Sequence, residues 1–241
     1  GGHRIILTSR VNSLGTKNGF NDRELQIMKK SGLRQLRFGA ESGSQVILNQ
    51  LKKGIKVEQI FESARMCKRN GIGVNYSFMV GIPGETYEQF METLDAIDKI
   101  YNIMGGENLS FSGPHALTVF PNGKLYEECV KFGFKPLTTL EEWAHLKRNS
   151  ISGDEKYYWT DHKYYDYIEN LNAIRAMNFI SIKKIFLPPY DIRKLRNFFA
   201  LPLILIIKLR WKFRFFKGKL IEIYFLNYLK KIFMGTRFAS I

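Results

Sequence analysis

Cysteine is scarce in this chain of 241 residues, which contains only Cys67 and Cys129. The two lie far apart, and neither has a second cysteine at the spacing that metal sites use, so thiolates of this chain cannot build a zinc or iron–sulfur site. A disulfide framework is not indicated either, because such frameworks need several cysteines. Both thiols are therefore predicted to be core residues. Two separated cysteines also suit a reducing compartment, and we expect a cytoplasmic protein.

Histidine is equally sparse, with four residues scattered along the sequence. None has another histidine four positions away, so we do not predict a histidine metal site. His115 follows Pro114 on a predicted strand whose end would face a cavity. It is therefore a candidate for contact with a substrate.

Acidic residues are nearly absent from the last fifth of the chain. Residues 193–237 hold twelve Lys/Arg and one acid, a net of +11 out of the formal +15 for the whole chain. The remaining body is almost balanced, so its charge does not indicate a nucleic-acid-binding protein. Residues 198–207 are apolar but number only ten and include a proline, which is too short to span a bilayer.

Three interpretations of this basic, apolar tail stay open. Its alternation of cations with bulky apolar groups suits the surface of an anionic membrane. It could instead form a basic helix that covers an open edge of the main fold. Binding of nucleic acid by charge and stacking is the third interpretation, and the one we least expect.

What the sequence does contain is a regular alternation of strand and helix signals. Strands are expected at residues 4–12, 35–41, 73–81 and 109–120, with helices between them. Asn21 with Glu24 and Thr86 with Gln89 have the spacing of capping boxes at helix starts. Residues 73–81 show almost no polar alternation, which predicts a strand covered on both faces.

This order predicts a parallel sheet with right-handed crossovers. Four strands could belong to a doubly wound sheet or to part of a barrel. In either fold, ligands bind at the carboxyl ends of the strands.

The first of two notable turns is "FGAESGS", where an apolar strand ends in Glu41 and continues into Ser42 and Gly43. A carboxylate at this edge can accept hydrogen bonds from both hydroxyls of a ribose. The two small residues after it would let a ligand approach the backbone, and Gly43 can adopt positive φ without steric cost. The alternative is an ordinary turn whose acid favours the next helix.

The second turn is "FMVGIPGET", in which Gly81 and Gly84 flank Pro83 and make the backbone bent and stiff. A flat ring such as adenine could stack on Ile82 with its edge against backbone groups. Glu85 then precedes the next helix. The alternative is that these residues serve only to start that helix.

These motifs in this order, "FGAESGS", "KKG" and "FMVGIPGET", resemble the later half of a radical S-adenosylmethionine (SAM) domain over residues 4–133. The likeness is greatest to the branch that often carries an N-terminal cobalamin-binding domain. It implies that Glu41 holds the ribose of SAM and that Ile82 with its neighbours contacts the adenine. Ser77 and Arg10 are weaker candidates for the methionine end.

The resemblance further implies an α/β fold, a partial (β/α) barrel of which this chain supplies the later strands. A 4Fe-4S cluster would cleave SAM to a 5′-deoxyadenosyl radical, for methylation, cyclisation or rearrangement of an organic substrate. The family's CxxxCxxC motif is absent here. We therefore expect a C-terminal part of a longer enzyme, inactive by itself. The expected division is 1–135 barrel, 136–192 helical extension and 193–241 basic tail.

Two other functions stay open. A methylthiotransferase shares both turns but typically adds a small RNA-binding β-barrel, which the tyrosine-rich residues after Leu140 do not suggest. A non-catalytic, nucleoside-binding or membrane-attached remnant is the other. For the enzyme we expect a small-molecule or lipid-like substrate, with membrane contact at the inner face through the tail.

Overall fold

The computed structural model describes residues 4–16, 19–106, 108–145, 193–215, 221, 224 and 225. The chain divides into two compact units, Gly1–Tyr165 and Asp166–Ile241. The first unit contains all the described strands, and the second contains one long described helix, α9 (Arg193–Lys212). The tyrosine-rich stretch predicted to be helical lies outside the described residues, so the predicted three-part division stays a prediction.

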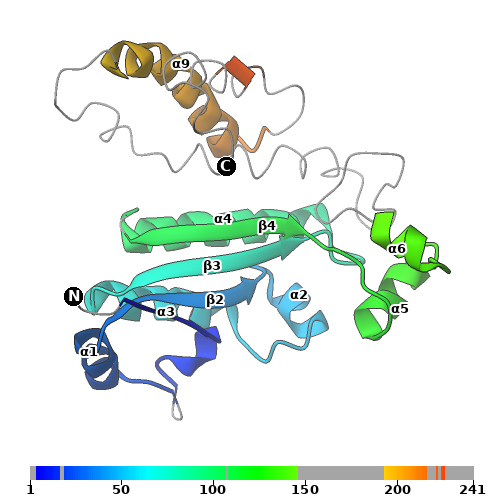
Figure 1. Cartoon of the computed structure of the whole chain (residues 1–241), viewed down its shortest axis with the longest axis horizontal. Coiled ribbons are helices and arrows are strands. Elements are labelled where there is room, and N and C mark those ends of the chain that lie inside the picture. The colour runs from blue at the N-terminus through cyan, green and yellow to red at the C-terminus, as the bar shows by residue number, and fades with distance from the viewer. Residues whose placement is uncertain are drawn as a thin grey trace. The chain divides into compact units, whose positions relative to one another are not determined.

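Four parallel strands form the sheet of the first unit, in the order β1-β2-β3-β4 (Figure 1). Their bounds are β1 Ile5–Ser9, β2 Leu33–Glu41, β3 Gly73–Val80 and β4 Leu109–Ala116. The connecting helices are α1 (Asp22–Lys30), α3 (Val57–Arg69) and α4 (Tyr87–Met104). A 3-10 turn, η1 (Val11–Ser13), follows β1, and a short helix, α2 (Gln45–Gln50), follows β2. Two further helices are α5 (Lys124–Lys131) and α6 (Leu140–His145).

The strand order decides between the two folds that the sequence leaves open. Each described strand pairs with the next one along the chain, so the sheet advances in one direction without the reversal of a doubly wound sheet. Right-handed crossovers then place all connecting helices on the same face. The fold is therefore that of a partial (β/α) barrel, as predicted.

Local sequence signals explain where the helices start. The Asn21 side chain accepts a hydrogen bond from the Glu24 amide, and the Glu24 carboxylate accepts one from the Asn21 amide. Thr86 and Gln89 form the same reciprocal pair at the start of α4. Both predicted capping boxes are confirmed.

The helix-covered face of the sheet forms the core. Phe38 of β2 stacks on Tyr76 of β3, with ring centroids 5.3 Å apart. The Tyr76 hydroxyl lies 2.6 Å from the Ser63 hydroxyl of α3, so this buried polar group is hydrogen-bonded. The same face holds the buried apolar residues Leu36, Ala40, Val74, Phe78 and Val80.

The opposite face of β3 differs from the prediction. Asn75, Ser77 and Met79 alternate with the buried residues and are each half-buried. The expectation that both faces of this strand are fully covered was therefore wrong, since methionine and two small polar residues obscured the alternation. This second face, called the inner face below, faces away from the helices.

Helix α9 is an uninterrupted helix that includes Pro202. Within the described ranges, no helix combines the length and the apolar character needed to cross a bilayer.

Candidate functional site

The inner face carries the polar side chains of the sheet. Successive strands contribute half-buried or exposed residues that point away from the core: Gln35, Arg37, Gly39 and Glu41 from β2, Asn75, Ser77 and Met79 from β3, and Ser110, Ser112 and His115 from β4. Near the amino ends of the strands this face is closed by its own hydrogen bonds. The Asn75 amide donates to the Ser110 hydroxyl at 2.7 Å. The half of the inner face at the carboxyl ends of the strands is therefore the part that can meet a ligand.

Small residues occupy the middle of the inner face. Gly39, Ser77 and Ser112 lie opposite one another on three consecutive strands. Their side chains are no larger than a hydroxymethyl group. Glu41 and His115 lie beyond the row, toward the carboxyl ends of β2 and β4.

Glu41 is the last residue of β2 and has a left-handed backbone, with φ +64°. This conformation is uncommon for a residue with a side chain and costs energy of order 1–3 kcal/mol. It turns the carboxylate back over Gly39, where an added Cβ would lie 2.7 Å from Glu41 Oε1. The absence of a side chain at Gly39 therefore makes room for the carboxylate.

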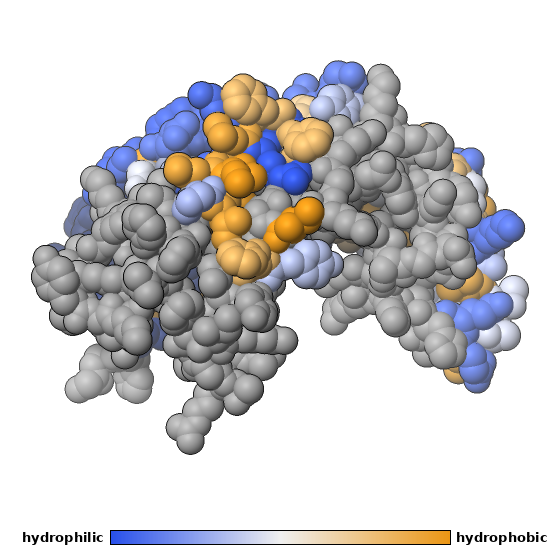
Figure 2. All heavy atoms as spheres, turned by 90° about the horizontal axis from the view of Figure 1, so that it is seen from above, coloured by the Kyte–Doolittle hydropathy of each residue, from blue (hydrophilic) through white to orange (hydrophobic). Residues whose placement is uncertain are grey.

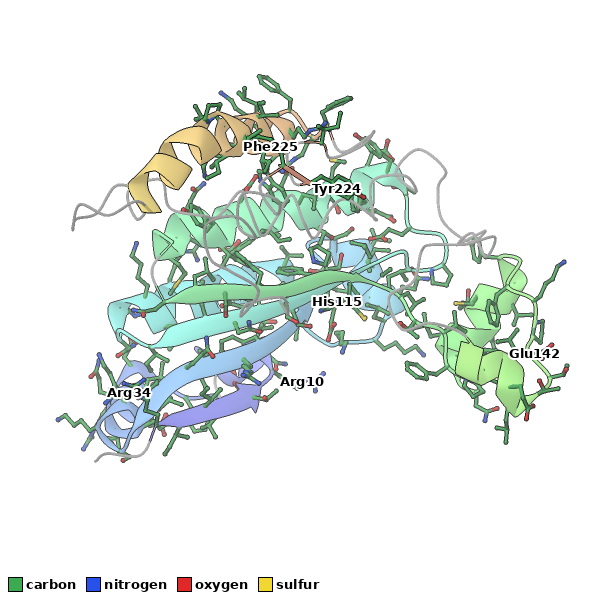
Figure 3. The ribbon with its side chains drawn as sticks, turned by 45° about the horizontal axis from the view of Figure 1, so that its top comes forward. Arg10, Arg34, His115, Glu142, Tyr224 and Phe225 are labelled. Carbon is green, nitrogen blue, oxygen red and sulfur yellow. The ribbon has the colours of Figure 1, made fainter. Side chains whose placement is uncertain are left out.

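Lys53 holds this carboxylate in place. Its Nζ donates to Glu41 Oε1 at 2.7 Å, and the Glu41 side chain is only 12% exposed. The Arg10 guanidinium at the end of β1 donates to the main-chain oxygen of Lys53. Figure 3 shows Arg10 at the end of β1. The Asn12 amide donates to the Gly54 oxygen at 3.3 Å, so the "KKG" turn is tied to the segment after β1.

Ser42 and Gly43 have a structural role that the sequence does not reveal. Gly43 does not have positive φ, so that prediction was wrong; the residue with positive φ in this turn is Glu41. An added Cβ on Gly43 would lie 2.3 Å from the main-chain oxygen of Glu92 in α4. Ser42 is fully buried and its hydroxyl lies 3.0 Å from that of Thr93. These two residues are small because α4 packs against them.

In the second turn, Glu85 is hydrogen-bonded to amides of its own turn. The Glu85 carboxylate is buried and accepts hydrogen bonds from the Gly81 amide at 2.6 Å and the Ile82 amide at 3.3 Å. It therefore closes its own turn. Its predicted contact with a ligand stays a prediction. The Ile82 side chain is completely buried and offers no exposed surface on which a ring could stack. Contact of a ligand with the rest of the turn, Pro83 and Gly84 included, stays a prediction.

Both turns nevertheless lie at one edge of the sheet. β2 and β3 are parallel neighbours, and Glu41 pairs with Phe78, near the start of the second turn. The Gln50 amide of α2, the helix that follows the first turn, donates to the Pro83 oxygen of the second turn at 2.8 Å.

His115 lies on the inner face beside β4, as Figure 3 shows. Its Nε2 is 3.0 Å from the Ser112 hydroxyl, an arrangement that fixes the orientation of the ring. This residue is half-buried and close to the carboxyl end of its strand, where the sequence places it. Its role as a substrate contact stays a prediction.

The two cysteines are buried core thiols, as predicted. Burial raises the pKa of Cys67 and of Cys129 to about 12, so neither is a thiolate near neutral pH. In the described part of the chain, no three His, Cys, Asp or Glu side chains cluster closely enough to hold a metal ion.

Lys53, Gly39 and Ser112 are the residues that the sequence did not single out. Lys53 stands in the "KKG" motif, but its pairing with an acid twelve positions earlier depends on the path of the turn. For Gly39 and Ser112 the signal was available as alternation along β2 and β4, which places them on the face opposite the apolar residues.

The sequence of this chain is similar to a known family and to several of its members. The model of the radical SAM superfamily matches residues 4–97, which include β1 to β3, both turns and the first half of α4. An uncharacterised methyltransferase of Pyrococcus horikoshii is 28% identical over 146 residues, covering 58% of this chain and 29% of the relative. Cytidylyl-2-hydroxyethylphosphonate methyltransferase of Streptomyces wedmorensis is 28% identical over 117 residues, covering 46% and 21%.

Among solved structures, the chain is similar to the cobalamin-dependent SAM radical enzyme OxsB with aqua-cobalamin and SAM bound. The TM-score is 0.50 at 15% identity, over 96% of this chain and 38% of the other. At this identity the likeness shows the fold alone. The chain spans less than a third of the length of the two curated relatives named above.

Proposed function

Through residues 4–97 the chain belongs to the radical SAM superfamily, and on that premise we propose that it supplies the SAM-binding edge of a radical SAM enzyme. The enzyme would modify an organic substrate by methylation, cyclisation or rearrangement. Methyltransferases among the relatives support methylation as the first choice. The observation that carries the proposal is the Glu41 carboxylate, held over Gly39 by Lys53 at the carboxyl edge of the sheet.

The described residues fit the nucleoside part of SAM. A carboxylate accepts two hydrogen bonds in a fork, and the adjacent hydroxyls of a ribose present two donors at matching separation. Glu41 lies at the edge where parallel α/β sheets bind ligands. The small side chains of Ser77 and Ser112 on the next two strands suit a ligand that lies against the sheet beside the carboxylate. Ser77 and Arg10 keep their proposed place near the methionine end.

Lys53 has two tasks in this proposal. It holds the free Glu41 carboxylate in the orientation that the ribose requires, which reduces the ordering cost of binding. It also keeps a positive charge beside the site, which would attract the carboxylate of SAM. The Arg10 contact with the Lys53 main chain fixes the turn on which this cation stands.

The iron–sulfur cluster does not fit residues of this chain. Its two cysteines are buried in separate elements, and the structure offers no thiolate set. The cluster ligands therefore belong outside the chain in this proposal. When bound, the cluster and SAM supply a 5′-deoxyadenosyl radical; the chain's own residues bind, orient and shield. Cobalamin enters the proposal through the sequence resemblance alone.

A substrate would meet the inner face beside the nucleoside. Met79 of β3 and His115 of β4, whose ring is fixed by Ser112, lie opposite each other near the carboxyl ends of these strands. A hydrogen-bonding imidazole next to a thioether suits a small-molecule or lipid-like substrate with both polar and apolar parts.

We also propose a cytoplasmic location with peripheral contact at the inner face of a membrane. The buried, unpaired cysteines suit a reducing compartment. The net positive charge of residues 193–237 supports attraction to anionic lipid.

Equilibrium binding tests the nucleoside site on the chain as it stands. Calorimetric titration with SAM and with 5′-deoxyadenosine should show that Glu41→Gln weakens both by about tenfold or more, since a hydrogen bond to a charged group contributes roughly 1.5–3 kcal/mol. Glu92→Gln, an exposed acid on α4, is the matched control and should bind as the original chain does. Equal binding by both variants, or no binding by the original chain, would contradict the proposal.

A further inference from the structure

Helix α9 has an exposed apolar face. Leu205 and Leu209 lie four residues apart. Phe213, just beyond the end of the helix, is four further on and its amide donates to the Leu209 oxygen, while Ile206 lies three before Leu209, so the four lie on one side. They are 45%, 52%, 68% and 44% exposed, respectively. We call these four residues the apolar stripe. A helix stripe of large apolar groups left in water costs energy unless something covers it.

The apolar stripe is not the core face of this helix. Ile204, Ile207 and Trp211 are buried and are spaced three and four apart. At 100° per residue they point in the direction opposite to the stripe. The helix therefore has two apolar faces, of which one is already buried.

Cations lie along both edges of the apolar stripe. Lys208 and Lys212 are four residues apart on one edge, and Arg210 lies on the other. The Arg210 guanidinium lies 5.1 Å from the ring centroid of Phe215, and that of Arg214 lies 5.2 Å from the ring of Trp211. The aliphatic part of such a side chain lies along apolar groups, while its charged end stays in a polar environment.

The charge of the segment is of one sign. Residues 193–215 contain seven Lys/Arg and no Asp or Glu. Beyond the helix, Phe215, Ile221, Tyr224 and Phe225 are also exposed, at 54%, 71%, 74% and 47%. Figure 2, which looks onto this region, shows apolar atoms gathered beside strongly hydrophilic ones.

From this arrangement we propose that α9 lies in the plane of an anionic lipid surface, with the apolar stripe inserted between headgroups. Lys208 and Lys212 on one edge and Arg210 on the other would then contact lipid phosphates. A helix with an apolar face, basic flanks and no acids has the features of interfacial helices. Charge complementarity favours anionic lipid over a protein partner. Three of the four residues of the stripe are Leu or Ile, which favours lipid over nucleic acid, where stacking rings would be needed.

This inference rests on the proposed membrane contact and assigns it to specific side chains. It also gives the enzyme a means of reaching a lipid-like substrate. It is independent of nucleoside binding at Glu41, which lies in the other unit of the chain.

Vesicle co-sedimentation of the whole chain tests it. The original chain should bind vesicles of phosphatidylcholine with phosphatidylserine and should bind phosphatidylcholine alone much more weakly. Leu205→Gln with Leu209→Gln should weaken binding by about tenfold or more for each leucine. Ile27→Gln with Leu140→Gln is the matched control, because these residues are 55% and 83% exposed in the first unit. The control should bind as the original does.

A second variant detects insertion of the apolar stripe into lipid without removing apolar surface. Phe213→Trp should add indole fluorescence that brominated lipids in the anionic vesicles quench, since the side chain would lie among acyl chains. Circular dichroism of every variant checks that helix content is retained.

Each outcome decides. Loss of binding in the double leucine variant, together with quenching of the new tryptophan, supports the proposal. Original-strength binding by that variant, or absence of quenching, would contradict insertion of the apolar stripe. Membrane contact driven by charge alone would still be compatible with that result. Failure of the original chain to bind any vesicle, with or without binding of a single-stranded oligonucleotide, would overturn both, and SAM titration would still report on the enzyme.

Discussion

Replacing Gly39 by alanine should displace the Glu41 carboxylate while leaving the stability of the sheet almost unchanged. An added Cβ would lie 2.7 Å from Glu41 Oε1, closer than two such atoms can approach. The obstacle is the far end of a flexible side chain, not backbone. The carboxylate can therefore rotate away, and the sheet can keep its register.

The structural cost of Gly39→Ala should be small. Rotating the Glu41 side chain off its preferred rotamer costs about 0.5–1.5 kcal/mol. Loosening its pair with Lys53, whose side chain is 36% exposed, costs about 0–1 kcal/mol because solvent screens the charges. Alanine offsets part of this by restricting the unfolded chain, by about 0.4–1 kcal/mol. The midpoint of thermal unfolding should consequently fall by only a few degrees.

The effect on the nucleoside should be larger. If the ribose depends on the Glu41 carboxylate at its present position, its displacement removes hydrogen bonds to a charged group, worth about 1.5–3 kcal/mol. That difference is about a tenfold to 150-fold increase in the Kd for 5′-deoxyadenosine. Calorimetric titration below the unfolding transition measures it.

Gly43→Ala provides the opposite pattern in the same turn. Its added Cβ would meet the main-chain oxygen of Glu92 at 2.3 Å and the Ala96 Cβ at 2.7 Å, and neither can rotate away. We expect a loss of about 1–3 kcal/mol in the free energy of unfolding, with the nucleoside Kd nearly unchanged while the protein is folded. Gly39→Ala binding the nucleoside as strongly as the original chain would refute the assigned role of the carboxylate.

Two further predictions concern the frame that holds the site. Thr86→Ala removes the hydroxyl that accepts a hydrogen bond from the Gln89 amide at the start of α4. Urea unfolding should show that the free energy of unfolding falls by about 0.5–2 kcal/mol. The control Thr138→Ala, outside any helix, should change the midpoint of urea unfolding much less. Because burial raises the pKa of the Cys67 and Cys129 thiols from 9.0 to about 12, the unfolded chain releases these protons first. The free energy of unfolding should therefore fall as pH rises from about 9 toward 12, and Cys67→Ala with Cys129→Ala should show a shallower fall; an identical slope in that variant would contradict this explanation.

The architecture was predictable because it depends on local signals. Capping residues at Asn21 and Thr86 mark the starts of helices through hydrogen bonds between neighbours in the chain. The apolar positions Ile60, Ala64 and Cys67 share one helix face and are all fully buried, as their spacing predicts. The choice between barrel and doubly wound sheet was not available locally, because it depends on which strands pair.

The site was harder to predict because similar residues can serve different ends. Glu41 and Glu85 both follow a strand beside a glycine-rich turn, yet one lies on the inner face and the other folds back onto its own amides. Gly43 is required by crowding from α4, which a sequence pattern cannot distinguish from a need for positive φ. The pairing of Lys53 with Glu41 depends on the tertiary path of the intervening helix α2.

A crystal structure of the chain soaked with 5′-deoxyadenosine measures the central claim most directly. We predict both ribose hydroxyls within hydrogen-bond distance of the Glu41 carboxylate, at about 2.7 Å, on the inner face of the sheet. A nucleoside bound elsewhere, with the Glu41–Lys53 pair unchanged and the inner face empty, would contradict the assignment of this edge of the sheet to SAM.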